Sequence, residues 1–162
     1  MTDSTHPKAR LEALGLTLPA LPKPGGNYLP YVIAGKLLYL SGKGAPTRDL
    51  APGSAVPKVG AEVGAEVSIA QAQGYARDVA LFHLATLEAA LGDLARVKQF
   101  VKVLGLVNAT PDFGDHPQVM NGYSDLMVAV FGERGRHARS AMGAGSLPKG
   151  FAVEVETIVE FV

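Results

Sequence analysis

The chain has 162 residues, of which 48% are hydrophobic and 19% charged, and its 15 basic and 15 acidic side chains leave no net charge. This length fits one domain with one core. The charge balance gives no overall field that would attract nucleic acid or an anionic membrane. The absence of cysteine excludes disulfide bonds, thiolate metal sites and a cysteine nucleophile. Because no apolar stretch is long enough for a signal peptide core or a membrane span, we expect a soluble cytoplasmic protein.

The first 24 residues predict a short helix followed by an extended arm. In Ser4–Leu14, a serine or threonine can cap the helix, Pro7 suits its first turn and Gly15 can close it. The range Leu16–Asn27 is rich in proline and glycine, so it should run extended over the surface. We expect both parts to pack on the domain as an appendage.

A β-hairpin and a long loop are predicted next. Tyr31–Ser41 alternates apolar runs around Gly35, which is typical of a hairpin. Gly42–Asp49 is glycine-rich but lacks the spacing of a phosphate-binding loop. We predict a flexible loop whose free amides can hold a carboxylate or carbonyl oxygen. Ala51–Ser68 predicts further loop and then a short strand.

Two long amphipathic helices are predicted in the second half of the chain. The first spans Ala70–Leu91 and ends at Gly92. It carries His83, which has no second ligand at metal-binding spacing, so we interpret it as a histidine at the edge of the core. The second begins at a cap, Asp115, and is closed by Gly132–Arg136.

The remaining segments predict strands. Arg96–Asn108 lies between the two helices, and its Gly105 suggests a β-bulge. Phe151–Val162 alternates apolar side chains with Glu154, Glu156 and Glu160, so one face packs and the other carries acid. The order of elements predicts a mixed sheet with both long helices on one face. The other face would then be buried by association with further subunits.

We expect the chemistry to lie near the C-terminal end. Arg139 precedes the connector Gly-Ser-Leu-Pro-Lys-Gly, whose composition suits a turn, so its segment could pair with the last strand and bring Arg139 near Glu154. A guanidinium facing a carboxylate would make a site for a small anionic substrate. The alternative is a surface arginine beside a solvated strand. On a strand, His137, two residues earlier, would face the same side as Arg139. It would either change the charge of the site near neutral pH or contact the site residues without touching the substrate.

Several short motifs occur together from Pro24 onward. They are Leu40-Ser41-Gly42, Leu91-Gly92-Asp93-Leu94, Asn121-Gly122-Tyr123, Ala138-Arg139-Ser140, Leu147-Pro148 and Val153-Glu154-Val155-Glu156. At this spacing they resemble the Rid family (reactive intermediate deaminase, also called YjgF or L-PSP endoribonuclease-like). The N-terminal helix and the string Phe131–Ser140 resemble the longer-chain branch of that family, whose activities are poorly defined.

The resemblance implies an α+β fold of the bacillary chorismate-mutase type. Three identical subunits would line a central barrel with their sheets, carry their helices outside and form clefts between neighbours. One Rid-like domain would span residues 1–162, with 1–24 as its N-terminal helix and arm. In deaminating members the cleft hydrolyses the enamine or imine of a small amino acid to a 2-keto acid and ammonia, with no metal or organic cofactor.

The resemblance also implies roles for five residues. Arg139 would hold the carboxylate of a small substrate through two parallel N–H bonds. The backbone amide of Gly42 and the side chain of Asn121 would bind the substrate beside it. Glu154 would accept a proton from the attacking water. Tyr28 corresponds to the family's tyrosine before the first strand and joins Glu154 as a candidate catalytic residue.

One departure from the deaminating branch leaves alternatives open. Ala141 stands where that branch has a cysteine, and Met142–Ser146 replaces a more polar stretch, which predicts a less polar and roomier cleft. A trimer that binds a small carboxylate or a protein partner without turnover is therefore the second hypothesis. The third is an endoribonuclease, as in the family's older name. Zero net charge disfavours it, and so does the presence of only two basic clusters, namely Lys43 with Arg48, and Arg134, Arg136, His137 with Arg139.

Overall fold

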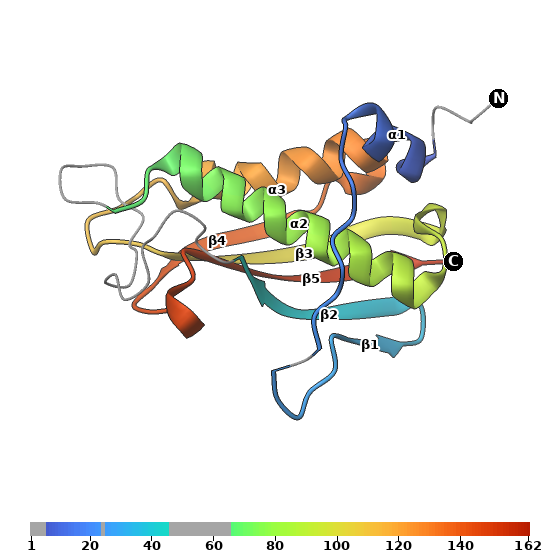
Figure 1. Ribbon diagram of the computed structural model, residues 1–162, viewed down its shortest axis with the longest axis horizontal. Coiled ribbons are helices and arrows are strands. Elements are labelled where there is room, and N and C mark those ends of the chain that lie inside the picture. Colours follow the sequence, from blue (N-terminus) through green and yellow to red (C-terminus); the bar gives the residue numbers. More distant parts are fainter. Residues whose placement is uncertain (1–5, 24, 46–65) are drawn as a thin grey trace.

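A computed structural model describes residues 6–23, 25–45 and 66–162 of the chain (Figure 1). The predictions for the helix cap at Ser4 and for most of the loop between Gly42 and Ser68 lie outside these residues. The helices and strands are, in order, α1 (Pro7–Ala13), β1 (Tyr31–Ala34), β2 (Leu37–Gly44), α2 (Ile69–Leu91), β3 (Val97–Asn108), α3 (His116–Phe131), β4 (Ala138–Ala144) and β5 (Val153–Phe161).

The five strands form one mixed sheet in the order β1-β2-β5-β3-β4. The β3–β4 pair is parallel, and the other pairs are antiparallel. Helices α2 and α3 lie side by side over one face of the sheet (Figure 1). The core fills the space between them, with Val103, Val155 and Tyr123 fully buried. This arrangement confirms the predicted α+β class and the placement of both long helices on one face.

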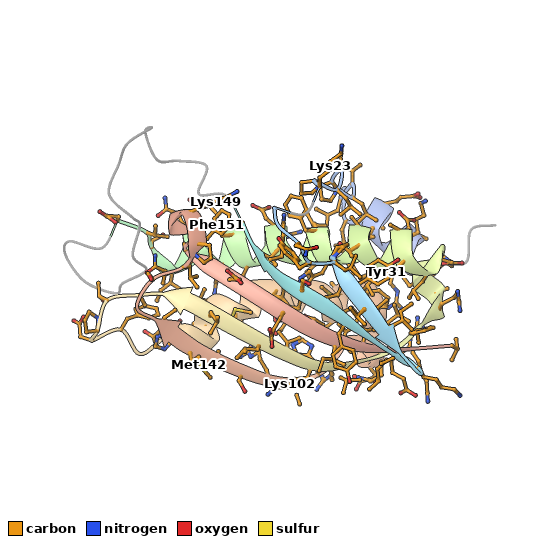
Figure 2. All side chains as sticks on the ribbon, turned by 90° about the horizontal axis from the view of Figure 1, so that it is seen from below. Lys23, Tyr31, Lys102, Met142, Lys149 and Phe151 are labelled. Carbon is orange, nitrogen blue, oxygen red and sulfur yellow. The ribbon has the colours of Figure 1, made fainter. Side chains whose placement is uncertain are left out.

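The other face of the sheet is left uncovered by α2 and α3. Figure 2 shows the sheet from below, with Lys102 and Met142 on its β3–β4 part. Large apolar side chains lie exposed on this face, among them Tyr39 at 42% and Met142 at 47% exposure. Lys102 Nζ donates a hydrogen bond to Ser140 Oγ across 2.7 Å. Exposed apolar side chains of this size are typical of a surface that another protein covers.

The N-terminal helix spans Pro7–Ala13. Its cap is His6, whose Nδ1 accepts a backbone hydrogen bond, and Pro7 occupies the first turn. Gly15, in the left-handed region at φ +67°, ends the helix as predicted. Residues 16–23 contain no helix or strand and cross α2 on their way to β1 (Figure 1), which confirms the extended arm in this part.

Helix α2 starts one residue before its predicted position because Ser68 and Gln71 form a capping box. Ser68 Oγ accepts from the Gln71 amide at 3.2 Å, and Gln71 Oε1 accepts from the Ser68 amide at 2.9 Å. Gly92 ends the helix at φ +77°. In α3, Asp115 holds the predicted cap position, but its carboxylate makes no cap hydrogen bond and accepts instead from Gln118 Nε2 at 3.0 Å.

A glycine lets α3 lie directly against α2. A Cβ atom on Gly122 would overlap the backbone carbonyl of Gln73 in α2. Because backbone cannot move aside as a flexible side chain can, the close approach of the two helices depends on this glycine.

Gly122→Ala is expected to lower the free energy of unfolding by about 1–3 kcal/mol, because the added methyl group must push the helices apart. Gly74 of α2 is a matched control, since a Cβ there meets no atom within 4 Å. Gly74→Ala is expected to raise the free energy of unfolding by about 0.5–1 kcal/mol through the better helix propensity of alanine. Urea unfolding measures both, and equal effects of the two substitutions would contradict the packing argument.

The predicted bulge at Gly105 is wrong. The register irregularities of β3 lie near its start, between Val97 and Gln99 and between Phe100 and Lys102. Gly105 itself pairs regularly with both neighbouring strands. A Cβ atom there would overlap the side chain of Met120, so this glycine makes room for α3.

The loop predicted from Gly42 onward begins later. Strand β2 continues to Gly44 and pairs with β5, with a register shift between Leu40 and Lys43. A Cβ atom on Gly44 would overlap the ring of Phe151. The glycines that favoured a loop therefore serve close packing inside a bulged strand.

The predicted pairing of the Arg139 segment with the last strand is also wrong. The segment forms β4, which pairs in parallel with β3, and β3 separates it from β5. The cause is the β3–α3–β4 connection, since a crossover through a helix returns the chain parallel to the strand that it left. The other edge of β3 is occupied by β5, so β4 takes the free edge.

Candidate functional site

Arg139 lies on β4 and is held by α3. Its Nη1 donates hydrogen bonds to Asn121 Oδ1 at 3.1 Å and to Ser124 Oγ at 2.9 Å, and its Nη2 donates to the carbonyl of Pro117 at 3.3 Å. A guanidinium has five N–H donors. The Nε donor and one Nη2 donor remain without a partner among the described residues, so the side chain is held in place and can still bind a carboxylate.

His137 supports this arrangement through Ser124. His137 Nδ1 lies 2.7 Å from the carbonyl of Gly135, so Nδ1 carries the proton and donates. Its Nε2 lies 3.0 Å from Ser124 Oγ and accepts from that hydroxyl. The hydroxyl of Ser124 thus accepts from Arg139 and donates to His137. Both His137 and Arg139 thus contact Ser124 of α3, and His137 itself lies just before β4.

The environment of His137 favours its neutral form. Burial lowers the pKa of His137, and the positive charge of Arg139 lowers it further, against the opposing effect of the Gly135 carbonyl. A neutral imidazole keeps Nε2 free to accept from Ser124. His137 therefore acts on Arg139 by orienting the hydroxyl between them.

Ser124 was not identified from the sequence. It lies three residues after Asn121, so both side chains point from the same face of α3. This spacing is the signal that could have found it once Asn121 was placed beside Arg139. Around these residues the surface forms an open hollow, which Arg136, His137 and Arg139 line together with α3.

Glu154 lies on β5 next to Gly42 of β2. A Cβ atom on Gly42 would lie only 2.5 Å from Glu154 Oε1, so the glycine gives the carboxylate its room. Burial raises the pKa of Glu154, and the nearby charge of Glu156 raises it further. A carboxylate with a raised pKa is a better proton acceptor than an ordinary glutamate.

Tyr28 lies near the part of β2 that is next to Glu154. Its side chain is 55% exposed and lines a cavity that Ser41 and Gly42 also line. Ser41 Oγ donates a hydrogen bond of 2.6 Å to the carbonyl of Leu29. This bond fixes the segment that carries Tyr28 to β2.

Arg139 and Glu154 do not meet in this structure, contrary to the prediction from their spacing. Arg139 stands beside Val103, whose side chain is buried beneath the helices, whereas Glu154 stands beside Leu106. Side chains alternate between faces along β3, so Val103 and Leu106 point to opposite faces of the sheet. Paired residues on neighbouring strands point to the same face, so Arg139 and Glu154 also lie on opposite faces. The structure therefore brings Arg139 together with Asn121, and Glu154 together with Gly42, as two separate half-sites.

A second buried polar group joins α2, α3 and β5. His83 is 2% exposed, and its Nδ1 lies 2.8 Å from Tyr123 Oη, which lies 2.8 Å from Thr157 Oγ1. The prediction of a core histidine is confirmed. No group of three possible metal-binding side chains occurs in the described ranges. None of the helices in these ranges has the length and apolar character needed to span a membrane.

Stability is expected to fall on acidification because of His83. Burial lowers its pKa to about 4, against the opposing effect of the Ser41 carbonyl, whereas an unfolded histidine has a pKa of about 6.5. Between these values the unfolded chain binds a proton that the folded chain does not. From pH 7 to pH 5 this should cost about 2 kcal/mol of unfolding free energy. Urea titrations of the wild type and of His83→Leu should show a smaller fall in the variant, and an equal fall would contradict this assignment.

Known proteins share this fold and sequence. A family model described as "YjgF/chorismate_mutase-like, putative endoribonuclease" matches residues 8–155. Protein TCP17 of Trypanosoma cruzi is 44% identical over 153 residues, which cover 94% of this chain and 92% of that protein. A crystal structure of a protein with unknown function from Agrobacterium tumefaciens is 41% identical, with a TM-score of 0.80 and coverage of 96% of this chain and 92% of that one. RidA from an Antarctic Psychrobacter species is 26% identical, with a TM-score of 0.56 and coverage of 87% and 94%.

The mixed sheet with two helices on one face is the fold of chorismate-mutase-like proteins. The chain belongs to the YjgF/chorismate-mutase-like family, because the family model covers most of its length. This confirms the resemblance that its motifs indicated.

Proposed function

We propose that this protein hydrolyses the reactive enamines and imines of small amino acids to 2-keto acids and ammonia. In this proposal it works as a homotrimer with a cleft between neighbouring subunits. The Arg139 half-site of one subunit faces the Glu154 half-site of the next. The similarity to a protein named RidA supports the reaction class.

The observation that carries the proposal is the division of the site into two incomplete halves. One half holds a guanidinium that is fixed by Asn121 and Ser124 and keeps two free donors. The other half holds Glu154, a carboxylate with a raised pKa. Each half supplies what the other lacks for binding and hydrolysing a small imino acid. Because β4 is an edge strand and β5 the central one, an assembly that places the β4 edge of one subunit near Glu154 on the uncovered face of the next would complete the site.

The chemistry follows from these groups. Arg139 binds the carboxylate of the imino acid and so fixes the position of the imine carbon. Water attacks the carbon of the protonated imine while Glu154 takes a proton from the water, which gives a neutral carbinolamine. Glu154 then returns the proton to the nitrogen, and the C–N bond breaks as the hydroxyl oxygen forms the carbonyl. The hydroxyl proton passes to water, so that ammonia and the 2-keto acid remain. The amide of Gly42 and the hydroxyl of Tyr28 bind the substrate on the Glu154 side.

The test is a competition for imino acids generated by an amino-acid oxidase. Semicarbazide traps each imino acid, and active protein diverts it to 2-keto acid and ammonia before it is trapped. We expect a lower rate of semicarbazone formation with the protein present. Unchanged rates for a panel of small amino acids would refute the deaminase. Sedimentation measures the assembly, and a monomer would refute the shared cleft.

A non-catalytic binder is the second candidate. Ala141 lies two residues after Arg139 on β4 and packs against the core, so this position offers neither a thiol nor a hydroxyl to a substrate. Binding of a small 2-keto acid without any turnover in the trapping assay would favour this candidate. Cleavage of RNA by the protein, lost in Glu154→Gln, would favour the endoribonuclease that the family description names.

A further inference from the structure

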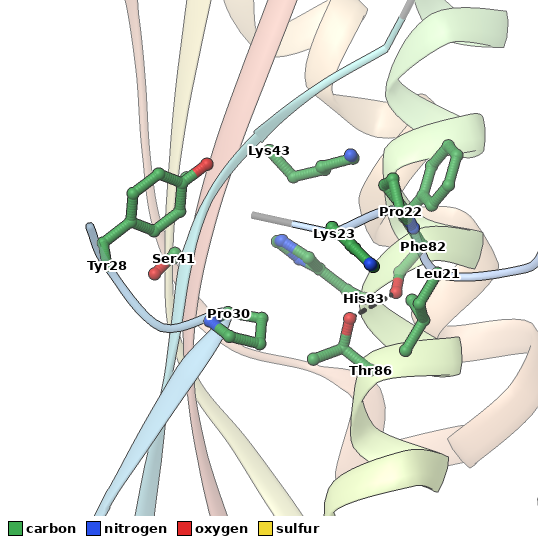
Figure 3. A pocket seen from close by; sticks show the side chains of 11 residues that line it. Leu21, Pro22, Lys23, Tyr28, Pro30, Ser41, Lys43, Phe82, His83 and Thr86 are labelled. Carbon is green, nitrogen blue, oxygen red and sulfur yellow. Dashed lines mark hydrogen bonds between the residues drawn. The ribbon is translucent and has the colours of Figure 1, made fainter. Parts of the chain in front are cut away.

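A small cavity lies between α2, β2 and the N-terminal arm (Figure 3). Its volume is about 100 Å³. Since a water molecule takes about 30 Å³ of the liquid, the cavity has room for a molecule of a few heavy atoms. Four parts of the chain form its walls. They are Leu21–Lys23 of the arm, Tyr28 and Pro30 before β1, Ser41–Lys43 of β2, and Phe82, His83 and Thr86 of α2.

This cavity lies on the helix side of β2, away from the carboxylate of Glu154. Lys43 pairs with Val155, which is fully buried beneath the helices, and its Nζ lies 4.6 Å from the centre of the Phe82 ring on α2. The next residue, Gly44, pairs with Glu154. Because consecutive residues point to opposite faces of a sheet, Lys43 points into the cavity and Glu154 points away from it.

The charged side chains that line the cavity are both positive. They are Lys23 and Lys43, and no aspartate or glutamate of the described ranges lines the cavity. Neither lysine forms an ion pair with a carboxylate within the described residues. Burial lowers the pKa of Lys43, and the charge of Lys149 lowers it further. An anion in the cavity would offset the cost of this partly desolvated ammonium group.

His83 adds a buried hydrogen-bonding group to the same cavity. It lines the cavity, and its ring lies between Lys43 and Thr86 in Figure 3. Its Nδ1 is used by Tyr123, whereas its Nε2 is buried and makes no well-formed hydrogen bond within the described residues, although the Ser41 carbonyl lies near the ring. A buried polar atom without a well-formed hydrogen bond can accept a further partner.

The direction of the hydrogen-bond chain decides what Nε2 can bind. If Thr157 donates to Tyr123 and Tyr123 donates to His83 Nδ1, then Nε2 carries the proton and is a donor. The backbone carbonyl of Ser41 lies near the ring and favours a proton there. An anion bound by the two lysines would also favour a proton on His83 Nε2, because Nε2 could then donate a hydrogen bond to that anion. The apolar part of the wall, made by Leu21, Pro22, Pro30 and Phe82, suits a short hydrocarbon chain.

We propose that this cavity binds a short-chain carboxylate, whose oxygens accept from Lys43 Nζ and His83 Nε2 and whose hydrocarbon end contacts Phe82. The cavity does not depend on Arg139 or on the carboxylate of Glu154, although Tyr28 and Gly42 of the proposed active site also line it. It goes beyond the proposed deaminase, because the same carboxylate would bind whether or not the protein hydrolyses imines.

The test is a titration of the full-length protein with propionate, followed through the ring ¹⁵N resonances of His83. Propionamide, which has the same shape without the charge, is the control ligand. We expect a saturable shift of the His83 resonances with propionate, and a protonated Nε2 before and after binding. Lys43→Met should weaken binding about tenfold, as expected for the loss of one charge-assisted hydrogen bond.

Two further variants separate this site from the proposed active site. Lys36→Met removes an exposed lysine from the turn before β2 and should leave propionate affinity unchanged. Arg139→Ala should also leave it unchanged, even if deamination is lost. Equal affinity for propionamide, an unaffected Lys43→Met variant, or loss of the His83 shift in Arg139→Ala would each overturn the proposal.

Discussion

Replacement of Arg139 by alanine is expected to lower kcat/KM for imino-acid hydrolysis by on the order of 100-fold, which corresponds to the loss of about 2–4 kcal/mol of charge-assisted hydrogen bonding. The reason is that the guanidinium alone orients a substrate too small to be held by other contacts. Asn121 and Ser124 would lose a donor, but both are near solvent and can bind water. The semicarbazide competition assay measures the loss directly.

Two companion variants show whether geometry or charge causes the loss. Arg139→Lys keeps the charge but cannot donate to Asn121, Pro117 and a carboxylate together, so it should recover little activity. Arg136→Ala removes an exposed arginine that lines the same open hollow and pairs with Glu133. It should retain wild-type kcat/KM. Similar losses in Arg136→Ala and Arg139→Ala would indicate general electrostatic attraction and contradict a specific carboxylate site.

Glu154→Gln is expected to lower kcat by about 10²–10⁴-fold, the usual range for a lost general base. The amide has nearly the same size as the carboxylate and fits beside Gly42, but it cannot take a proton from water. Substrate binding should change little, because Arg139 holds the carboxylate. Glu160→Gln is the matched control, since Glu160 lies on the same strand and pairs with Lys98. A similar fall of kcat in both variants would argue against Glu154 as the base.

The pH profile gives an independent measure of the same residue. A base must be deprotonated, so activity should rise with pH through the pKa of Glu154. Burial and Glu156 raise that pKa, which moves the acidic limb of the profile to higher pH than for an ordinary glutamate. Glu156→Gln removes one of these causes and should move the limb to lower pH. A limb that stays in place would show that another group controls it.

The sequence predicted the elements well because their signals are local. The capping box at Ser68 and the glycine at Gly92 delimit α2 to within one residue of the prediction. The alternation in β5 likewise marks Val153, Val155 and Val159 as core, and all three are fully buried. Such signals depend only on neighbouring residues, so tertiary contacts did not override them.

The errors concern contacts between distant residues. Gly44 and Gly105 were assigned to a loop and a bulge, yet each makes room for a large side chain from another element, Phe151 and Met120. The position of β4 beside β3 is set by the crossover through α3. The short connector between β4 and β5 does not make these two strands pair. For the same reason, the spacing of Arg139 and Glu154 in the sequence could not show that they lie on opposite faces of the sheet. Ser124 was missed because its partner, Arg139, lies on another element.

The separation of Arg139 and Glu154 on opposite faces of the sheet has a genetic consequence. In the proposed trimer each cleft takes its arginine from one subunit and its glutamate from the next. A mixed trimer of Arg139→Ala and Glu154→Gln subunits would then contain one cleft in which both residues are intact. Two inactive alleles of this gene would therefore complement each other in one cell, although neither subunit carries a working pair of its own.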